Sequence, residues 1–283
     1  MLSRREWMAA LPAAAVRAQS GKAKMFGDAE AYERFMGRWS GLLAPLLVDF
    51  TGISDGGYVL DVGSGTGALA FAAARTKGKC RVLGIDPSAE YVAYAKSRNP
   101  FGDRVSFETG DAQQLRMSDA AFDASASLLV FNFIPDPAKA LREVKRVTKP
   151  GCPISAAVWD YGDGMRMLRA FWDAVAAVDP AAEKSDERHM RLCRNGELAA
   201  LWRQGGLRDV EERPLEITMR FASFADFWDA FLLGQGPAGS YVARLDAGRK
   251  QALRTEVHRR LDLKSETTAF PLPARAWAVR GTR

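Results

Sequence analysis

The chain has 283 residues, of which 47% are hydrophobic and 10% aromatic, a composition that excludes a disordered, collagen-like or coiled-coil protein. The net charge is +6, but the first 24 residues carry five basic side chains and one acidic side chain, which leaves +2 on the other 259. We therefore expect no nucleic-acid partner, because nucleic-acid binders usually concentrate basic residues on one surface. No stretch approaches the ~18 apolar residues of a membrane helix, so no membrane partner is expected.

Cysteine and histidine usage argues against a disulfide framework and against a metal site. Cys80, Cys152 and Cys193 are odd in number, lie far apart and form no Cys-x-x-Cys pair. The chain has only two histidines, too few for the usual mixed zinc ligand sets. We expect no bound metal.

The first 20 residues, MLSRREWMAALPAAAVRAQS, have two features of an export signal. Arg4 and Arg5 form a twin-arginine pair, and a short alanine-rich run ends in a Val-x-Ala sequence that is similar to a cleavage site. A basic extension without export function is the alternative, because the apolar run is short and interrupted by a proline. Both interpretations leave residues 1–24 outside the folded domain, which we assign to residues 25–283.

The next part of the sequence predicts helices and then a regular alternation of strands and helices. Residues 26–50 repeat apolar side chains at helical spacing, which predicts one or two helices broken near Gly37 and Pro45. The alternation that follows is typical of a mostly parallel sheet covered by helices on both faces. The predicted strands are 58–62, 80–85, 105–107, 122–130 and 154–159, and the predicted helices are 68–75, 88–98 and 137–147.

Beyond residue 160 the regular alternation ends. The sequence predicts helices at 165–178 and 197–203 and a strand at 210–217. The segment 221–261 is rich in aromatic residues and is predicted to be mostly helical around the sequence GQGPAG. The last predicted strand is 274–280.

The most informative motif is the glycine-rich turn DVGSGTG between the first predicted strand and the helix that follows it. Its glycines, Gly63, Gly65 and Gly67, let the backbone turn tightly and approach a ligand closely, and the helix beyond offers free N–H groups. Asp86 ends the second strand and Asp111 follows the third. Because the carboxyl ends of parallel strands share one edge, these groups are predicted to form one site.

Two kinds of cofactor are compatible with this arrangement. The spacing from Gly63 to Ala68 satisfies the dinucleotide-binding pattern, and Asp86 lies where an acid would bind the ribose of NAD. Against NAD, the carboxylate of Asp61 would repel a pyrophosphate, whereas it could receive the ammonium of a cofactor that carries an amino acid. In addition, no tyrosine is followed by lysine four residues later, as in short-chain dehydrogenases.

With these residues the sequence resembles the class I S-adenosylmethionine-dependent methyltransferases, in particular the small-molecule group similar to the ubiquinone and menaquinone C-methylases. The resemblance extends over residues 32–159 and is carried by VLDVGSGTG, VLGIDPS, FETGDAQQL and FDASASLLVFNFIPDPAKALREVKRVTKPG. It implies an α/β fold with a seven-stranded, mostly parallel, doubly wound, Rossmann-like sheet whose last two strands are antiparallel neighbours. It also implies an N-terminal helical lid and a helical insertion before the last strand.

The resemblance further implies which residues bind S-adenosylmethionine. The glycine-rich turn would surround the methionine part, Asp86 would bind the ribose hydroxyls, and Asp111 would hold the adenine. Leu128 and Leu129 would line the sulfonium region, and Arg38 in the lid would pair with the cofactor carboxylate. The complete predicted cofactor site consists of Tyr32, Arg38, Trp39, Asp61, Gly63, Ser64, Gly65, Gly67, Asp86, Pro87, Ser88, Asp111, Ala112, Leu128 and Leu129.

The catalytic residue is left open by the resemblance, because Asn132 stands where many relatives have histidine. A general base is optional for methyl transfer to an acidic phenol or an enolisable carbon. The segment 131–135, FNFIP, also lacks the Asn/Asp-Pro-Pro-aromatic motif of amino-directed nucleic-acid methyltransferases. The candidate bases are Asp160, Tyr161, His189 and His258.

The predicted function is transfer of a methyl group from S-adenosylmethionine to a small hydrophobic or aromatic acceptor. Aromatic residues are concentrated in the predicted acceptor-side half, 161–283, outside the cofactor-binding half, 25–160. The alternatives are an NAD(P)-dependent dehydrogenase and an inactive S-adenosylmethionine-binding protein. A cytoplasmic location is expected because the cofactor is made there, and export is the alternative. The acceptor and the oligomeric state do not follow from the sequence.

Overall fold

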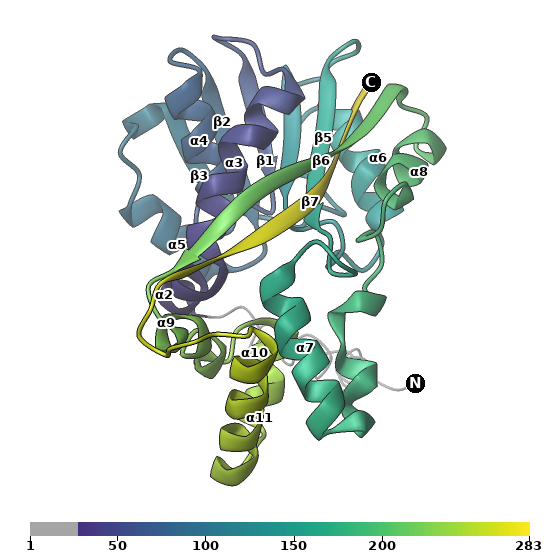
Figure 1. Ribbon diagram of the computed structural model, residues 1–283. Coiled ribbons are helices and arrows are strands. Elements are labelled where there is room, and N and C mark those ends of the chain that lie inside the picture. The colour runs from purple at the N-terminus through teal and green to yellow at the C-terminus, as the bar shows by residue number, and fades with distance from the viewer. Residues whose placement is uncertain (1–27) are drawn as a thin grey trace, which may run out of the picture.

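The computed structural model describes residues 28–283, so the predicted extension, residues 1–24, lies outside the described residues. The strands of the described part form one seven-stranded sheet (Figure 1). They are β1 (Tyr58–Val62), β2 (Arg81–Asp86), β3 (Val105–Thr109), β4 (Ala124–Leu128), β5 (Pro153–Trp159), β6 (Arg208–Phe221) and β7 (Phe270–Thr282). Their order in the sheet is β3-β2-β1-β4-β5-β7-β6.

Strand directions confirm the predicted doubly wound sheet. The first five strands are parallel, and β7 lies antiparallel between β5 and β6. The central strand β4 is buried along its whole length, as expected for a parallel strand covered on both faces. The last two strands are longer than predicted, because they continue past the sheet as a two-stranded arm whose final register pair is Phe221 and Phe270 (Figure 1).

Helices alternate with the parallel strands, and polar side chains mark where two of them begin. Ser88 caps the helix after β2 by accepting a hydrogen bond from the backbone N–H of Tyr91 at 3.2 Å. Asp136 caps the helix after β4 in the same way, with Pro137 at the first helical position. These helices are α4 (Ala68–Thr76), α5 (Ala89–Ser97), α6 (Pro137–Val147) and α8 (Glu197–Gln204), and a 3₁₀ turn, η3 (Gly102–Arg104), precedes β3.

The N-terminal segment stays helical throughout, which corrects the predicted break at Pro45. It consists of α2 (Ala29–Tyr32), a π-helical turn η2 (Glu33–Gly37) and α3 (Arg38–Thr51), with Pro45 inside α3. Pro45 has no N–H to donate to the carbonyl of Gly41, four positions before it, so α3 lacks one backbone hydrogen bond there. Apolar residues on both sides of Pro45 are fully buried, so their packing holds the helix together.

A group of helices, here named the helical cap, lies beyond the carboxyl ends of the parallel strands (Figure 1). Its members are α7 (Arg166–Val178), η4 (Pro180–Ser185) and η5 (Glu187–His189) after β5, and α9 (Phe224–Trp228), η6 (Phe231–Leu233), α10 (Gly236–Ala243) and α11 (Ala247–Arg260) before β7. The second set confirms the predicted helical insertion before the last strand. Phe231 stacks on Phe171 at 4.4 Å between ring centroids and meets Phe35 of η2 edge-on at 5.5 Å, so the cap is joined to the N-terminal segment.

Within residues 28–283 no helix is both long enough and apolar enough to cross a membrane. The same residues contain no group of three or more histidine, cysteine or acidic side chains that could hold a metal ion.

Candidate active site

The glycine-rich turn between β1 and α4 is held against β2 by its own backbone. The N–H groups of Gly63 and Ser64 both donate to the carbonyl of Ile85 at 2.8 Å. The φ angles at Gly63, Gly65 and Gly67 are +73°, +51° and +97°, which side chains rarely adopt. A Cβ would lie 2.5 Å from Val130 at Gly63 and 2.7 Å from Phe71 at Gly67, whereas at Gly65 it would meet nothing within 4 Å. Gly63 and Gly67 are therefore needed because a side chain would collide with Val130 or Phe71, whereas Gly65 faces open space.

Asp61 is a buried carboxylate at the end of β1 with one oxygen free. Its side chain is 1% exposed, and Oδ2 accepts a hydrogen bond from the backbone N–H of Ala70 at 3.0 Å. Oδ1 has no hydrogen-bond partner among the described residues. Burial raises the pKa of Asp61 to about 8, and the nearby charge of Asp86 adds to the rise. Such a carboxylate requires a cationic or hydrogen-bonding ligand to ionise at neutral pH.

Asp86 ties the glycine-rich turn to the start of α5. Oδ2 accepts from the N–H of Gly65 at 2.9 Å, and Oδ1 accepts from the N–H of Ser88 at 2.8 Å. Asp86 is buried, and burial raises its pKa. Its neighbour Pro87 is exposed, while the hydroxyl of Ser64 is buried without a partner in the described chain. The structure thus brings Asp61, Ser64, Gly65 and Asp86 together at one edge of the sheet.

The residues after β3 and β4 complete this edge. Asp111 is exposed, and its Oδ1 accepts from the N–H of Gln113 at 2.8 Å, with Ala112 partly buried between them. Leu128 and Leu129 are each 8% exposed at the end of β4. Leu129 has a φ of +65°, an unfavourable conformation for leucine, and its N–H donates to the carbonyl of Ala157 at 2.7 Å. Strain of this kind is common at functional sites.

The predicted lid residues contact both the sheet edge and the helical cap. Tyr32 packs against Tyr91 of α5 with ring centroids 5.4 Å apart. Arg38 donates to Asp226 of α9 at 2.8 Å, and its guanidinium lies 4.3 Å from the ring centre of Trp39. A role for Arg38 toward a cofactor carboxylate stays a prediction, and it requires this ion pair to rearrange.

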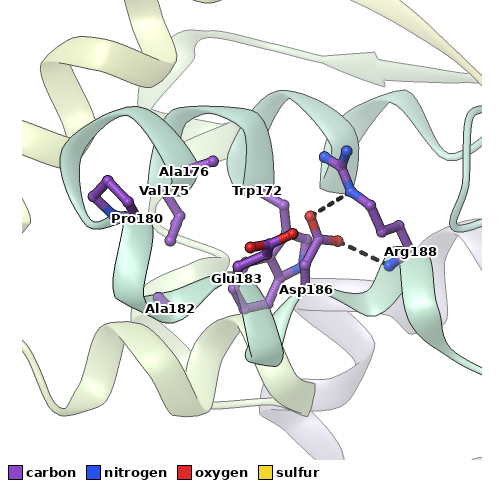
Figure 2. Close-up of a pocket in the computed structure, with 8 residues that line it drawn as sticks. All are labelled: Trp172, Val175, Ala176, Pro180, Ala182, Glu183, Asp186 and Arg188. Carbon is purple, nitrogen blue, oxygen red and sulfur yellow. Dashed lines mark hydrogen bonds and ion pairs between the residues drawn. The ribbon is translucent and has the colours of Figure 1, made fainter.

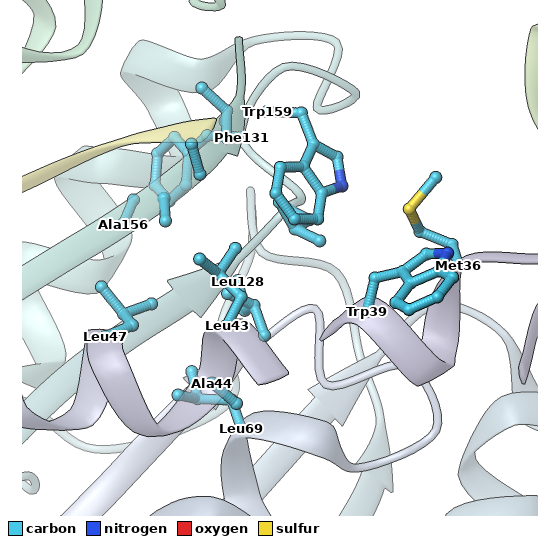
Figure 3. Close-up of a cluster of buried hydrophobic side chains, with 14 of the residues drawn as sticks. Met36, Trp39, Leu43, Ala44, Leu47, Leu69, Leu128, Phe131, Ala156 and Trp159 are labelled. Carbon is cyan, nitrogen blue, oxygen red and sulfur yellow. The ribbon is translucent and has the colours of Figure 1, made fainter. Parts of the chain in front are cut away.

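An apolar cluster lies beside the end of β4. Figure 3 shows Met36 and Trp39 of the N-terminal segment in one buried group with Leu128 and Trp159 from the ends of β4 and β5. The indole Nε1 atoms of Trp39 and Trp159 are buried and have no partner among the described residues. The structure thus offers an apolar wall with two unused hydrogen-bond donors.

The four candidate bases differ in their surroundings. Asp160 is held by Arg275 of β7 through contacts of 2.6 and 2.9 Å. Burial raises the pKa of Tyr161 well above its ordinary value. His189 is exposed, and His258 of α11 packs edge-on against Phe224 in the helical cap.

Sequence reasoning missed a further buried acid, Glu187, in the polar stretch PAAEKSDERHM. Its Oε2 accepts a hydrogen bond from the indole N–H of Trp172 at 2.7 Å, and burial raises its pKa to about 7. No periodicity in the sequence marks this residue, because it lies outside α7 and contacts Trp172, 15 residues earlier, only after the chain turns back through η4.

A surface pocket in the helical cap lies between α7, η4 and η5 (Figure 2). Asp186 on its wall pairs with the buried Arg169 at 2.5 Å and with Arg188 at 2.6 Å. A second pocket lies between η2 and α9, beside the ion pair of Arg38 and Asp226. Neither pocket is lined by Asp61, the glycine-rich turn or Asp86.

Comparisons with known proteins match the part of the chain that forms this edge of the sheet. Residues 60–155, which run from β1 to β5, match the family model described as a methyltransferase domain. The chain is 38% identical over 106 residues to the ubiquinone/menaquinone biosynthesis C-methyltransferase of Bdellovibrio bacteriovorus, covering 37% of this chain and 45% of that protein. It is 31% identical over 150 residues to the chloroplastic 2-phytyl-1,4-beta-naphthoquinone methyltransferase of Arabidopsis thaliana, covering 50% and 57%. The chain therefore contains a class I S-adenosylmethionine-dependent methyltransferase domain.

A solved structure supports the fold of this methyltransferase. The phosphoethanolamine N-methyltransferase 2 of Haemonchus contortus, in complex with S-adenosyl-L-methionine, aligns with a TM-score of 0.56 at 17% identity, over 94% of this chain and 59% of that one. The match to the two curated relatives covers about half of each relative's length.

The residues at the sheet edge fit the family's cofactor, S-adenosylmethionine. The free, buried Oδ1 of Asp61 suits the ammonium of the methionine part, and the open space at Gly65 suits close approach of a ligand to the backbone. Asp86 and the unpartnered Ser64 hydroxyl are the groups available to ribose hydroxyls.

Replacing Asp86 by alanine is expected to weaken S-adenosylhomocysteine binding by roughly 10- to 150-fold, because two ribose hydrogen bonds to a carboxylate are lost. The substitution also removes the hydrogen bond from the N–H of Gly65 to Asp86, so the glycine-rich turn is less well ordered before the ligand binds. Calorimetry measures the affinity, and Asp103→Ala, at an exposed acid in η3 outside the predicted cofactor site, is the control. Unchanged affinity with a lower melting temperature would assign Asp86 a purely structural role.

Proposed function

We propose that this methyltransferase acts on a small hydrophobic or aromatic acceptor bound between the sheet edge and the helical cap. The observation that carries the proposal is the apolar cluster at the end of β4, in which Leu128, Met36, Trp39 and Trp159 belong to one buried group (Figure 3). Two relatives support an aromatic acceptor, because their names specify methyltransfer in ubiquinone/menaquinone biosynthesis and to a naphthoquinone. We also propose the division into a cofactor-binding half, 25–160, and an acceptor-side half, 161–283.

S-adenosylmethionine supplies a methyl group on a positively charged sulfur and so brings its own activation. The protein's task is to hold a nucleophile in line with that methyl group and to exclude water. Asp61 would bind the ammonium, Asp86 would bind the ribose, and Leu128 with Trp159 would keep water from the reacting atoms. The helical cap would enclose the acceptor, since its aromatic residues bury a planar ligand well.

Of the two alternatives, the dehydrogenase has no support from the comparisons. The inactive binding protein is distinguished from an enzyme by turnover alone, because both would retain Asp61, Asp86 and the glycine-rich turn.

The first test is ligand preference. Calorimetry is expected to show S-adenosylhomocysteine binding at least about 100-fold more tightly than NAD or NADP, because only the former has an ammonium for Asp61. Tighter binding of NAD would overturn the proposed function.

The second test is an acceptor screen with S-adenosylmethionine carrying an isotopically labelled methyl group. Phenols, naphthols and hydroquinones form the test panel, and polar aliphatic alcohols and amines of similar size form the control panel. Mass spectrometry is expected to find the label in members of the aromatic panel. Labelling confined to the control panel would contradict the proposed acceptor class, and S-adenosylhomocysteine binding without any turnover would support the inactive binding protein.

A further inference from the structure

The ion pair of Arg38 and Asp226 joins the N-terminal segment to the helical cap. Nη1 of Arg38 donates to Oδ1 of Asp226 at 2.8 Å, and Nη2 donates to the backbone carbonyl of the same residue at 3.4 Å. Asp226 is itself fixed at the start of α9, because its Oδ2 accepts from the N–H of Ala222 at 3.0 Å and its own N–H donates to Ser223. The carboxylate is therefore anchored, and the long side chain of Arg38 is the part of the pair with freedom to move.

One side of this ion pair faces the second surface pocket, between η2 and α9. The pocket has a volume of about 310 Å³, at the lower end of the range of small-molecule pockets. Its lining residues come from the N-terminal segment and from the helical cap, and they are Glu33, Arg34, Arg38, Asp226, Asp229 and Ala230. The ion pair thus forms part of the pocket wall.

The other side of Arg38 faces buried aromatic rings. Its guanidinium carbon lies 4.3 Å from the ring centre of Trp39 and 5.2 Å from that of Phe221. Both rings are buried, and neither lines the pocket. Trp39 belongs to the apolar cluster that also contains Leu128 and Trp159 (Figure 3). The side chain of Arg38 therefore lies between the pocket and the apolar cluster.

The closed position of Arg38 is held only weakly. The side chains of Arg38 and Asp226 are 29% and 31% exposed, and an ion pair that water can reach contributes little stability. In addition, Nε of Arg38 is buried without a hydrogen-bond partner among the described residues, so it has lost its hydration without gaining a bond. Contact with the two aromatic rings offsets part of this cost. Turning the side chain into solvent would hydrate Nε again and would break one exposed ion pair.

We propose that the pocket is the entrance to the apolar cluster and that Arg38, held by Asp226, is its gate. The class of molecule that enters, an uncharged planar aromatic acceptor, rests on the proposed function, whereas the gate rests on the contacts of Arg38 alone. When Arg38 leaves Asp226, the rings of Trp39 and Phe221 become part of the pocket wall and can receive a planar molecule. Return of Arg38 to Asp226 then excludes water during methyl transfer.

The indole N–H of Trp39 reports the opening of this gate in the free protein. It is buried without a hydrogen-bond partner among the described residues, so burial alone slows its exchange with solvent deuterium. NMR of the full chain labelled with ¹⁵N at tryptophan measures this exchange, and Trp39→Phe assigns the resonance. The indole N–H of Trp202, which donates to the carbonyl of Ile154 at 3.0 Å, is the internal reference for global unfolding.

Asp226→Asn is the test variant, because asparagine keeps an oxygen for the N–H of Ala222 and removes the charge that holds Arg38. Exchange at Trp39 is expected to accelerate about 2- to 10-fold in this variant, because the closed position loses its ion pair. Exchange at Trp202 is expected to stay unchanged.

Salt and a second ion pair provide the controls. Added salt is expected to accelerate Trp39 exchange in wild type and to have little effect in Asp226→Asn, because salt screens an exposed ion pair. Glu266→Gln is the matched control variant, since it breaks the 2.7 Å ion pair of Glu266 with Arg254 of α11. It is expected to leave Trp39 exchange as in wild type.

Entry of an acceptor is tested with 2-naphthol as the probe. Stopped-flow fluorescence follows its binding to protein saturated with S-adenosylhomocysteine. A gate changes the barrier equally in both directions, so Asp226→Asn is expected to raise the association and dissociation rates by the same factor, about 2- to 10-fold. The Kd is expected to stay within about twofold of the wild-type value.

Equal Trp39 exchange in wild type and Asp226→Asn would overturn the gate, and acceleration shared by Trp202 would give the ion pair a purely structural role. A changed Kd for naphthol with an unchanged association rate would overturn the entrance. These outcomes leave the proposed function intact. Absence of naphthol binding to protein that binds S-adenosylhomocysteine would instead contradict the proposed acceptor class, and the gate would then be decided by Trp39 exchange alone.

Discussion

Replacing Gly65 by alanine is expected to weaken S-adenosylhomocysteine binding by about 100-fold while lowering the free energy of unfolding by only about 1–2 kcal/mol. The stability cost is small because an added methyl group would meet nothing within 4 Å and only the φ of +51° would be unfavourable. The binding cost is large because that methyl group would enter the space where the cofactor's methionine part is predicted to lie. Calorimetry and urea unfolding measure the two effects separately.

Gly63→Ala is the matched control in the same turn. There the added methyl group would lie 2.5 Å from Val130 at a φ of +73°. Backbone strain and overpacking together are expected to lower the free energy of unfolding by about 2–5 kcal/mol. If Gly65→Ala kept full affinity, the open space at Gly65 would not be the cofactor site.

The affinity of the methyltransferase for S-adenosylmethionine is expected to rise up to about tenfold per pH unit between about pH 6 and pH 8. Burial raises the pKa of Asp61 to about 8 in the free protein, so below that pH the carboxyl group is protonated. The ammonium of the cofactor requires the ionised form, and binding therefore releases a proton. Asp61→Asn is expected to abolish this pH dependence and to lower the affinity at pH 8 by about 10²- to 10³-fold.

Two controls separate this effect from general damage to the site. 5′-Methylthioadenosine lacks the ammonium, so its affinity is expected to depend little on pH and to change little in Asp61→Asn. Because the pKa of Asp61 is raised in the fold, its contribution to stability is complete below the unfolded value of 3.8 and is lost as the pH rises toward about 8. Without cofactor, Asp61→Asn is therefore expected to melt at a higher temperature than wild type at pH 8. A lower melting temperature would contradict the assignment.

The sheet could be predicted because its signals are local. Each parallel strand is a short apolar run, and Ser88 and Pro137 mark the beginnings of helices that follow strands. The predicted break at Pro45 was wrong because the rule for proline considers the local backbone alone. In the structure, Leu43 and Leu47 on either side are fully buried, and their packing outweighs the missing hydrogen bond.

The two halves of the candidate site also differ in whether local sequence patterns are enough to predict them. The glycine-rich turn and Asp86 lie at strand ends, so the alternation of strands and helices along the chain is enough to place them at one edge of the sheet. The partner of Arg38 is Asp226, 188 residues away, and no local pattern connects them. Glu187 accepts a hydrogen bond from Trp172, and this contact requires α7 and η5 to pack together.

The arm formed by β6 and β7 also bears on how the acceptor side of this fold can vary. The chain leaves the arm after Phe221 and returns at Phe270, and these two residues are register partners with stacked rings 5.3 Å apart. The segment between them, which contains α9, η6, α10 and α11, has ends that strand pairing already closes, so lengthening one of its turns costs little extra entropy. Changes of length in the exposed turns of residues 222–269 are therefore expected to be tolerated better than replacement of the whole segment, because Phe231 packs on Phe171 and Asp226 pairs with Arg38.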